Sequence, residues 1–351
     1  MKYKVQGQLF SRSDLELWCW DHLRYAPSWE KSHLLFMLQW LSRSTSIDVR
    51  TSGSTGKPKR ITLSKKMMSE SAMITKELLT LSDSSKVMLA LPSQFIAGKM
   101  MIVRALVNNM ELQWIKPSAD PYSDLKSAPD FIALTPMQVR NALISHNELF
   151  NQTGKVLVGG QQIDSALEDR LQNSAPECFE TYGMTETSSH VAIRMVNGKE
   201  RSSNFSAIPG ITFSQDNRSC LVIHSESWFD EPLVTNDVVE LQETGEFRWL
   251  GRVDHVINSG GVKIFPELVE SKLRPILGQQ RFIIHKEADA VTGEKVILYL
   301  ERISGQEADQ QVLAGKMKEV LSAAENPKSI YLVDKFEETE TYKIIRKTYL
   351  S

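Results

Sequence analysis

The sequence has few of the features that mark secreted, membrane or metal-binding proteins. Its 351 residues include only three cysteines, Cys19, Cys178 and Cys220, and their wide spacing matches no metal-binding pattern. Isolated cysteines of this kind are typical of a reducing compartment. No eighteen apolar residues run together, and the N-terminus lacks a continuous apolar segment. We therefore expect a cytoplasmic protein without a membrane span or a secretory signal.

An excess of charge of either sign is also missing. The chain has 41 basic and 43 acidic residues, so its formal net charge is −2, and no charged tail stands out. This balance argues against nucleic acid as a partner. Hydrophobic residues make up 41% and charged residues 24%, as in ordinary globular proteins. The length exceeds what one small core needs, so we expect two domains, or one large domain with a small appendage.

The first two thirds of the chain alternate between helical and strand patterns. Residues 1 to about 46 look helical and are rich in tryptophan, which is typical of a core or an interface. Apolar spacing predicts an amphipathic helix over 64–81. The segments 87–91, 131–134 and 156–158 look like buried strands. Because helical segments follow these strands, the pattern predicts an α/β layer with a largely parallel sheet.

One of those helices is predicted over 165–173, where Ser165 and Glu168 have the spacing of a capping box. From about residue 205 the pattern changes to short strands at 220–223, 238–241 and 247–250, which predict an antiparallel subdomain.

A further compact unit is predicted beyond Arg252. It contains a helix that begins at Pro266, a hairpin around 292–294, a helix near 306–324 and a strand at 329–333. We therefore predict an α/β protein with two domains. Residues 1–253 would form a large domain with mixed, largely parallel sheets, helices and a β-rich subdomain, and residues 254–351 a small α+β domain.

The loop Thr51-Ser-Gly-Ser-Thr-Gly-Lys-Pro-Lys59 combines glycines, hydroxyls and lysines between two apolar segments. Such a loop can surround phosphate oxygens, because glycines let backbone N–H groups converge while hydroxyls donate and lysines neutralise charge. It is not a Walker A loop, since only two residues separate Gly53 from Gly56. By itself it could equally be a flexible surface linker.

Five further segments carry chemically useful residues. They are Leu91-Pro-Ser-Gln-Phe-Ile-Ala-Gly98, Val158-Gly-Gly160, Glu180-Thr-Tyr-Gly-Met-Thr-Glu-Thr187, Thr235-Asn-Asp237, and Gly251-Arg-Val-Asp254 leading into Asn258-Ser-Gly-Gly-Val-Lys263. Together with the Ser/Thr/Gly loop, and in this order, they resemble the adenylate-forming superfamily of acyl- and aryl-CoA synthetases, adenylation domains and luciferases. The resemblance covers residues from about 47 to about 346.

The resemblance implies a binding site for ATP. The β- and γ-phosphates would be held by the loop residues Thr51, Ser52, Gly53, Ser54, Thr55, Gly56 and Lys57. Gly159, Gly160 and Gly183 would let the backbone approach the nucleotide closely, and Tyr182 would stack on adenine. Asp237 would accept hydrogen bonds from the ribose hydroxyls.

The resemblance also implies the catalytic groups. Thr185 would donate to the α-phosphate, Glu186 would help to hold Mg²⁺, and Arg252 would pair with ribose or phosphate. The small C-terminal domain would swing about a hinge at Asp254. Lys343 would bridge carboxylate and phosphate during adenylation.

The segment around Lys343 departs from the family pattern. Tyr342 stands where a glycine is usual, and Glu337 where a proline is common. The alternative is a lysine on an exposed C-terminal strand. The reaction implied is attack of a carboxylate on the α-phosphorus of ATP, followed by displacement of AMP by a thiol. ATP, Mg²⁺ and coenzyme A are therefore the expected cofactor and co-substrates.

The position of the phosphate loop narrows the comparison. It begins at residue 51, whereas typical members place a much longer segment before it. With this short segment before the loop, the chain resembles compact bacterial o-succinylbenzoate–CoA ligases of menaquinone synthesis. A dicarboxylate substrate needs a cation for the carboxylate that is not activated. Lys99, which directly follows Gly98, is the first candidate for it, and Arg104 is the second. Both could instead lie on an exposed helix surface.

Other residues near the expected acid pocket have a simpler interpretation. Phe95 and Met184 would form its walls, and His190 would meet an aromatic face or a keto oxygen of the substrate, unless it is a structural histidine. Three alternatives stay open: another aryl or acyl acid, a carrier-protein thiol in place of coenzyme A, and a non-catalytic AMP-binding regulator. The tryptophan-rich N-terminus could also serve an oligomer interface.

Overall fold

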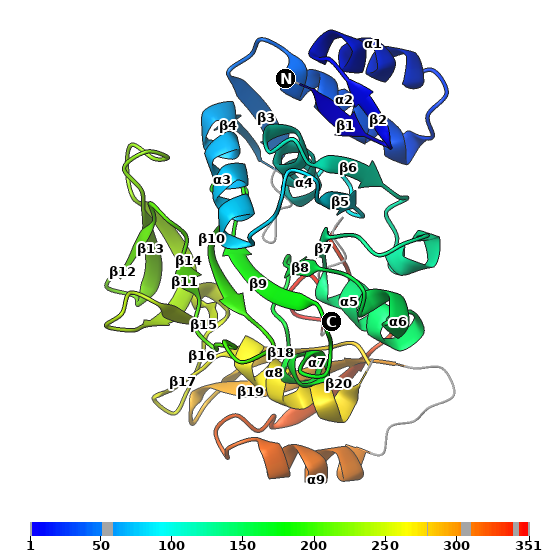
Figure 1. Cartoon of the computed structure of the whole chain (residues 1–351). Helices are drawn as coiled ribbons and strands as arrows, with labels where there is room; N and C mark the ends of the chain where they lie inside the picture. Colours follow the sequence, from blue (N-terminus) through cyan, green and yellow to red (C-terminus); the bar gives the residue numbers. More distant parts are fainter. Residues whose placement is uncertain (1, 51–58, 279, 303–309, 340–343, 350–351) are drawn as a thin grey trace.

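The computed structural model describes residues 2–50, 59–278, 280–302, 310–339 and 344–349 (Figure 1). These residues form a nine-stranded sheet, a four-stranded sheet, a five-stranded sheet and a two-stranded hairpin, with helices packed around them. The α/β class predicted from the sequence is thus confirmed. No helix in the described ranges is long and apolar enough to cross a membrane.

The nine-stranded sheet has the strand order β11-β10-β9-β8-β7-β5-β6-β1-β2. Its strands are β1 (Tyr3–Val5), β2 (Gln8–Phe10), β5 (Lys86–Leu89), β6 (Glu111–Trp114), β7 (Phe131–Leu134), β8 (Lys155–Val158), β9 (Glu177–Gly183), β10 (His190–Met195) and β11 (Ser206–Ala207). The strands from β9 to β1 in this order run parallel, and β2, β10 and β11 pair antiparallel at the two edges.

Helices cover both faces of this sheet. They are α1 (Arg12–His22), α2 (Ser28–Leu41), α3 (Lys65–Leu78), α4 (Ile96–Val107), α5 (Pro136–Ser145), α6 (Asn147–Phe150) and α7 (Ser165–Leu171), with the 3-10 turn η1 (Pro121–Asp124). Alternate strand residues enter two different cores: Phe131 packs in the core with α1 to α4, and Ile132 in the core with α5 and α7. Burial on both sides explains why the central strands are continuously apolar.

The helical prediction for residues 1–46 was wrong at its beginning. Residues 3–10 form a short hairpin, in which Gln6 and Gly7 take positive φ angles of 48° and 75°. Two positive φ angles in a row match the tight turn that the right-handed twist of a hairpin favours. Strands of three residues contain too few alternating positions to be recognised from the sequence, whereas α1 and α2 beyond them are helical as expected.

A second hairpin lies beside the predicted phosphate loop. Strands β3 (Ser46–Arg50) and β4 (Arg60–Ser64) pair antiparallel, and Arg50 is the register partner of Arg60. The hairpin therefore brings Arg50 and Arg60, which lie on either side of the segment 51–58, close together. The loop residues Thr51 to Lys57 themselves lie outside the described residues.

The four-stranded antiparallel sheet confirms the predicted β-rich region. It contains β12 (Thr212–Gln215), β13 (Cys220–His224), β14 (Leu233–Leu241) and β15 (Phe247–Arg252). Phe247 is fully buried in the core between this sheet and β10. The sheet therefore packs against the antiparallel edge of the large sheet.

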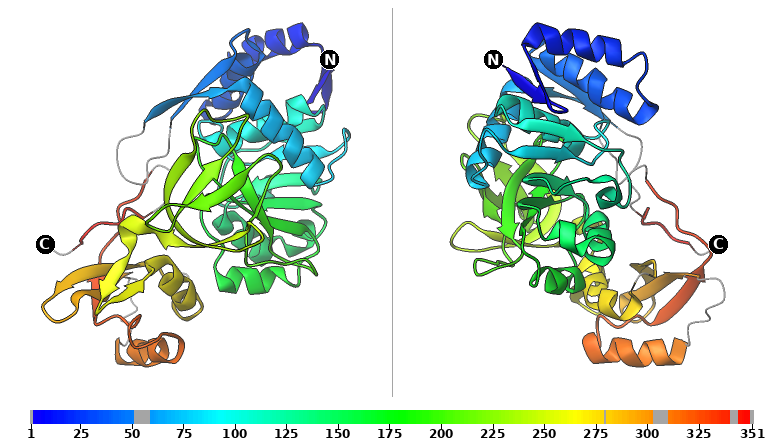
Figure 2. Two further views of the ribbon diagram at one scale, coloured as in Figure 1. Left: turned by 90° about the vertical axis from the view of Figure 1, so that its left-hand side faces the viewer. Right: turned by 45° about the vertical axis from the view of Figure 1, so that its right-hand side comes forward.

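The chain then forms a unit with its own core, at the opposite end of the molecule from α1 and α2 (Figures 1 and 2). Its elements are η2 (Val253–His255), β16 (Ile257–Ser259), β17 (Val262–Ile264), α8 (Pro266–Leu277), β18 (Phe282–Asp289), β19 (Gly293–Glu301), α9 (Gln310–Val320) and β20 (Ser329–Val333). The predicted hairpin, the helix beginning at Pro266 and the strand at 329–333 are confirmed. A domain boundary at 253/254 and a mobile C-terminal domain stay predictions.

Helix α7 connects this unit to the rest of the described chain. Ser165 Oγ lies 3.4 Å from the carbonyl oxygen of Ser271 in α8, and Arg274 Nε lies 3.8 Å from Asp164 Oδ2. Asp164, not Ser165, is the N-cap of α7, since its side chain accepts from the Leu167 N–H at 3.0 Å. The predicted cap was wrong by one residue because both residue types cap helices well.

We predict that Gly98→Ala destabilises the protein by about 1–3 kcal/mol, the usual cost of overpacking. A Cβ at position 98 would lie 2.4 Å from the Pro92 carbonyl oxygen, and backbone cannot move aside easily. Gly315→Ala in α9 is the control, because a Cβ there meets nothing within 4 Å. It should be neutral, or stabilising by about 0.5–1 kcal/mol. Urea unfolding of both variants makes the comparison, and equal effects would contradict this packing.

Candidate active site

The predicted nucleotide residues meet at the end of strand β9. The Tyr182 hydroxyl donates to Asp237 Oδ2 at 2.7 Å. Asp237 is the register partner of Arg252 across β14 and β15, and their charged groups lie 3.7 Å apart. Burial, together with the neighbouring carboxylate of Asp237, raises the pKa of Tyr182 well above its usual value, so the phenol stays protonated. The structure thus brings together three residues that are spread over 70 positions of the sequence, from Tyr182 to Arg252.

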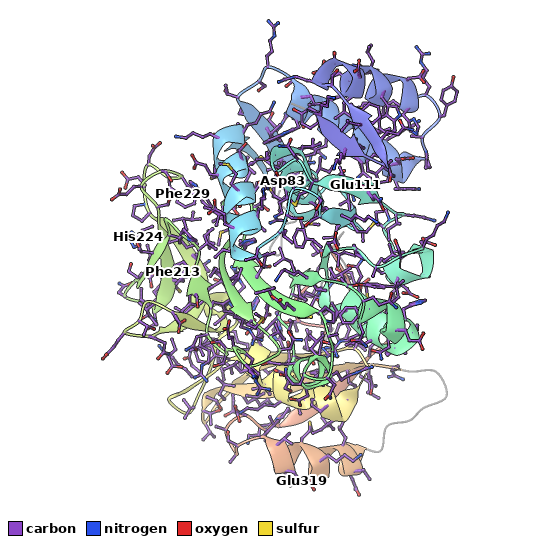
Figure 3. All side chains as sticks on the ribbon, viewed as in Figure 1. Asp83, Glu111, Phe213, His224, Phe229 and Glu319 are labelled. Carbon is purple, nitrogen blue, oxygen red and sulfur yellow. The ribbon has the colours of Figure 1, made fainter. Side chains whose placement is uncertain are left out.

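The Tyr182 ring rests against the core of the β-rich region. Phe247 meets it edge-on at a centroid distance of 5.1 Å. Phe213, which lies on β12 and is labelled in Figure 3, meets Phe247 edge-on at 5.0 Å. The aromatic contacts and the bond to Asp237 fix the orientation of the ring. Stacking of this ring on adenine stays a prediction.

Arg252 continues the chain of polar contacts to the predicted hinge. Its Nη2 donates to Asp254 Oδ2 at 2.9 Å, while Asn236 Nδ2 donates to the same oxygen at 3.3 Å. The Nε of Arg252 is buried and has no hydrogen-bond partner within the described residues. One donor of this guanidinium therefore remains for a ligand such as the ribose or phosphate that the sequence suggested.

The loop after β9 has a fixed backbone that presents Thr185 and Glu186. Gly183 is required there, because a Cβ would lie 2.3 Å from the Ser189 carbonyl oxygen. The Thr187 hydroxyl accepts from the Met184 N–H at 3.0 Å and donates to the Ser189 carbonyl at 2.6 Å. These bonds close the loop. Sequence reasoning quoted Thr187 in the motif but gave it no function.

Within the loop, Thr185 is half-buried and Glu186 is exposed. No group of three or more His, Cys, Asp or Glu residues that could hold a metal occurs in the described ranges. A single exposed carboxylate nevertheless fits Mg²⁺, because this ion is commonly held by one or two carboxylates together with substrate phosphates. Glu186 is the residue that would supply this ligand.

The glycines after β8 lie against the same motif. A Cβ on Gly159 would lie 2.6 Å from Thr181 Oγ1, and Gly160 has a φ angle of +85°. Both positions therefore need glycine, and the strand β9 can pass close to them. A close approach of the nucleotide to the backbone at Gly159 and Gly160 stays a prediction.

A buried ion-pair network, which the sequence analysis missed, supports this region. Glu180 Oε1 accepts from the Ile163 N–H at 2.8 Å, and Glu180 Oε2 lies 2.6 Å from Arg194 Nε. Arg194 also pairs with Glu168 of α7 at 3.0 Å. The network ties the segment after Gly160 to β9 and β10. Neighbouring strands in the large sheet bring these residues together, and no local sequence pattern marks them.

The second part of the site is a buried cluster around Arg104, a residue of α4. Its Nη2 donates to Ser189 Oγ at 2.5 Å and lies 3.4 Å from His190 Nδ1, while its Nε donates to Thr75 Oγ1 at 3.3 Å. Arg104 is only 4% exposed, and burial lowers its pKa to about 10. No carboxylate of the described residues forms an ion pair with it. The structure therefore contains a buried cation beside the motif loop.

His190 is neutral in this cluster. Burial, and secondarily the charge of Arg104, lower the pKa of His190 to about 3. Its Nε2 lies 3.5 Å from Thr75 Oγ1. The predicted meeting of His190 with a substrate therefore has to involve an uncharged imidazole.

Lys99, the other predicted cation, lies elsewhere on α4. Its Nζ donates to the Ser93 carbonyl oxygen at 2.5 Å and stands 4.9 Å from the centroid of the Phe36 ring in α2. It is 9% exposed, and burial lowers its pKa to about 8. The alternative of two surface cations was thus wrong, because both side chains are buried. Lys99 faces α2, whereas Arg104 faces Ser189 and His190.

The remaining predicted residues have simple surroundings. Phe95 is the N-cap residue of α4 and is half-buried, and Met184 packs partly buried against the core of the β-rich region. Their contact with a substrate stays a prediction. Lys343 lies outside the described residues, but Arg346, three positions later, pairs with Glu270 of α8 at 2.7 Å. The sequence analysis missed Glu270 because its partner is 76 residues away.

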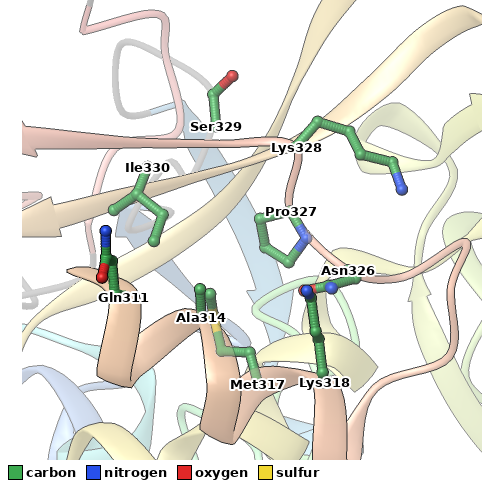
Figure 4. Close-up of a pocket in the computed structure, with 9 residues that line it drawn as sticks. All are labelled: Gln311, Ala314, Met317, Lys318, Asn326, Pro327, Lys328, Ser329 and Ile330. Carbon is green, nitrogen blue, oxygen red and sulfur yellow. The ribbon is translucent and has the colours of Figure 1, made fainter.

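Two cavities lie in or beside the C-terminal unit. One of about 100 Å³ is lined by residues that include Asp254, His255 and Arg346. The other, of about 300 Å³, is an open depression between α9 and β20, lined by residues that include Met317 and Ile330 (Figure 4). No predicted nucleotide or acid-binding residue lines the second one, so we assign it no part in the site.

Comparison with known proteins agrees with this arrangement. The family model described as AMP-binding enzyme matches residues 50–214. The solved structure of an acyl-CoA synthetase (AMP-forming)/AMP-acid ligase II-like protein from Dyadobacter fermentans is 34% identical, with 94% of this chain and 95% of that chain covered and a TM-score of 0.63. The fold and site are those of an adenylate-forming enzyme. The chain belongs to the family of AMP-forming acyl-CoA synthetases and AMP-acid ligases.

Two further relatives are more distant. A 2-succinylbenzoate–CoA ligase from Lactococcus lactis is 24% identical over 323 residues, which cover 86% of this chain and 70% of that protein. The o-succinylbenzoate coenzyme A synthetase from Bacillus subtilis, solved with ATP and magnesium ion, has a TM-score of 0.71 at 21% identity, with 85% of this chain and 68% of that chain covered. This chain is thus an adenylate-forming CoA ligase, a class that uses ATP, Mg²⁺ and coenzyme A.

We predict that Tyr182→Phe weakens AMP binding about three- to tenfold, the usual cost of one hydrogen bond. The substitution keeps the ring and its contact with Phe247 but frees the Asp237 carboxylate. Calorimetric titration with AMP measures the change. Tyr25→Phe is the control, because Tyr25 is 80% exposed and far along the chain from the site. An unchanged Kd in Tyr182→Phe would contradict a function for this bond in holding the ribose-binding carboxylate.

We also predict a pH-dependent stability that arises from His190. Because burial lowers its folded-state pKa to about 3, the unfolded chain takes up a proton below its ordinary pKa of 6.5 while the folded chain does not. The contribution of His190 to the free energy of unfolding is thus fully present above pH 6.5 and decreases as the pH falls below this value. Between pH 7.5 and pH 5 it should account for about 2 kcal/mol of the loss.

Urea unfolding of wild type and His190→Gln at both pH values measures this contribution. The glutamine variant cannot take up the proton, so its stability should fall less than that of the wild type over the same interval. Parallel losses in the two proteins would contradict the neutral, buried state of His190.

Proposed function

We propose that this chain joins o-succinylbenzoate, an aromatic dicarboxylic acid, to coenzyme A. The observation that carries the proposal is the buried guanidinium of Arg104, which has no ion-pair partner within the described residues. It lies beside Ser189 and His190, at the end of the loop that presents Thr185 and Glu186. An acid bound between them would have one carboxylate near the predicted α-phosphate position and the other near Arg104.

The physical argument is that an unpaired buried charge is costly. Taking a charged group out of water is unfavourable unless an opposite charge and hydrogen bonds compensate it. A guanidinium can bind a carboxylate through two parallel N–H donors, so the free carboxylate of a dicarboxylic acid would compensate Arg104 well. A simple aryl acid has no such group and would leave the charge unpaired.

Hydroxyl groups around Arg104 suit the same ligand. Ser189 Oγ and Thr75 Oγ1 already contact the guanidinium. Ser71 Oγ and Ser188 Oγ are buried and have no hydrogen-bond partner within the described residues. Free hydroxyl donors in a dry site can add hydrogen bonds to a carboxylate, and the neutral ring of His190 gives the apolar part of an aromatic acid a surface.

Lys99 fits this function less well than Arg104. Its Nζ donates to the Ser93 carbonyl and lies over the Phe36 ring, so the side chain is turned toward α2. The names of the relatives support the substrate: the matching proteins from Lactococcus lactis and Bacillus subtilis are 2-succinylbenzoate (o-succinylbenzoate) ligases. We therefore infer that Arg104 is the specificity-determining cation.

The proposed reaction has two steps. The activated carboxylate oxygen attacks the α-phosphorus, the bond to pyrophosphate breaks, and the thiolate of coenzyme A then displaces AMP from the acyl-adenylate. In the first step Asp237 would hold the ribose, Thr185 would donate to the α-phosphate, and Glu186 would hold the magnesium ion. Lys343 would bridge carboxylate and phosphate, with residues 254–351 moving about Asp254 between the steps.

We predict that the wild type catalyses ATP–pyrophosphate exchange with o-succinylbenzoate far better than with benzoate, a fatty acid or an amino acid. Arg104→Met should raise the KM for o-succinylbenzoate about 10- to 100-fold, the usual value of a charge-assisted hydrogen bond. Its activity with benzoate should not fall, since benzoate has no second carboxylate. Lys66→Met on α3, whose side chain is exposed, is the matched control.

Exchange with a different acid would contradict the proposed substrate while leaving the enzyme class intact. Equal losses with o-succinylbenzoate and benzoate in the methionine variant would instead show that Arg104 supports the fold rather than selects the acid.

A further inference from the structure

A second buried polar cluster, made of His33, Ser93 and Lys99, joins the N-terminal helix α2 to α4. His33 Nδ1 lies 2.7 Å from Ser93 Oγ, and Ser93 Oγ donates to Ser32 Oγ at 3.2 Å. Lys99 Nζ donates to the Ser93 carbonyl oxygen at 2.5 Å. Ser93 is thus held through its hydroxyl by α2 and through its carbonyl by α4.

The segment from Pro92 to Phe95 is packed tightly against the first turn of α4. Phe95 N–H donates to the Pro92 carbonyl at 3.2 Å, and Gly98 lies so close to that carbonyl that a Cβ would stand 2.4 Å from it. Together with the bond from Lys99 to Ser93, these contacts fix the turn that leads from β5 into the helix. Without Lys99 the Ser93 carbonyl would lose this hydrogen-bond donor, and an unsatisfied buried carbonyl destabilises the fold.

The α2 side of the cluster is equally fixed. His33 is fully buried between the rings of Trp29 and Trp114, at centroid distances of 5.8 and 6.1 Å. Trp114 Nε1 in turn donates to Glu30 at 2.7 Å, so β6 holds the same helix face. Burial, with the charge of Lys99, lowers the pKa of His33 to about 4, so the imidazole is neutral and serves as a hydrogen-bonding group.

The cluster acts on the helix that carries Arg104. Lys99 and Arg104 are five residues apart, which on an α-helix places them about 140° apart around the axis. Lys99 accordingly meets α2, and Arg104 meets Ser189 and His190. A rotation or shift of α4 that loosens the contact of Lys99 with α2 therefore also displaces Arg104 from Ser189 and His190.

We propose that His33, Ser93 and Lys99 are positioning residues for the acid substrate. They lock α4 and the turn before it onto α2, so that Arg104 and Phe95 stand where the acid binds. Helix α2 then supports the acid site, although none of these three side chains touches the substrate. The inference rests on the proposed function for the place of the acid, and it explains why the sequence has a buried lysine next to Gly98.

The test compares paired variants that remove or keep each hydrogen bond. Lys99→Met and His33→Leu remove the bonds to Ser93. Lys99→Gln keeps a donor, and His33→Asn keeps an amide near the place of Nδ1. Lys31→Met, on the exposed side of the same helix α2, is the matched control. ATP–pyrophosphate exchange gives kcat, the KM for the acid and the KM for ATP, and urea unfolding checks that each variant is folded.

We expect Lys99→Met and His33→Leu each to raise the KM for the acid about tenfold, because small misplacements of binding groups have effects of that size or larger. The KM for ATP should not change, and the Gln and Asn variants should recover most of the loss. If His33→Leu does not fold, Ser93→Ala removes the same bond between His33 and the Ser93 hydroxyl with a smaller change in volume, and it leaves the bond from Lys99 to the Ser93 carbonyl intact.

Three results would overturn the inference. The first is an unchanged KM for the acid in folded Lys99→Met and His33→Leu, and the second is an equal rise in the KM for ATP. The third is a loss in Lys99→Met without a loss in His33→Leu, which would indicate a direct bond from Lys99 to the substrate. The comparison uses whichever acid the wild type activates. The wild type alone shows whether o-succinylbenzoate is the substrate, whereas the variants show whether His33, Ser93 and Lys99 position the acid. Failure of one proposal is thus distinguishable from failure of the other.

Discussion

Arg104 carries a buried charge that has no ion-pair partner among the described residues, and the acid site that we propose is organised around it. Three elements far apart in the sequence converge on it: Thr75 of α3, the helix α4 itself, and the loop end at Ser189 and His190. Burial makes the guanidinium expensive when it is alone and strongly binding when a carboxylate is present. The proposed selectivity for a dicarboxylate therefore arises from a buried charge that costs the free protein stability.

The parallel sheet explains how the nucleotide side meets this charge. Strands β5, β7, β8 and β9 run in the same direction, so the segments after them all emerge at one edge. Gly98 in the segment after β5, Gly159 directly after β8 and Gly183 at the end of β9 each lie too close to neighbouring atoms for a Cβ. The three tight turns keep the motif loops close together, and the β-rich region adds Asp237 and Arg252 beside Tyr182.

Local sequence patterns predicted the strands and helices that depend mainly on residues adjacent in the chain. The strands of 131–134 and 329–333 have the expected bounds, because a short apolar run between turn residues specifies a buried strand. The motif residues Tyr182, Asp237 and Arg252 could be grouped only through the resemblance to a family. Contacts between distant segments escaped prediction: neither the Glu180–Arg194 pair nor the bond between His33 and Ser93, 60 residues apart, leaves a signal in composition or spacing. Whether Lys99 is buried or exposed could not be decided from the sequence for the same reason.

The most direct test of the central claim is the structure of the complex with o-succinylbenzoate and a non-reactive ATP analogue. We expect the free carboxylate to lie about 2.7–2.9 Å from the guanidinium nitrogens of Arg104, the distance of a charge-assisted pair. The carboxylate to be activated should then point toward Thr185. A free carboxylate in solvent or bound to Lys99, with Arg104 still without an anion, would show that Arg104 does not select the acid.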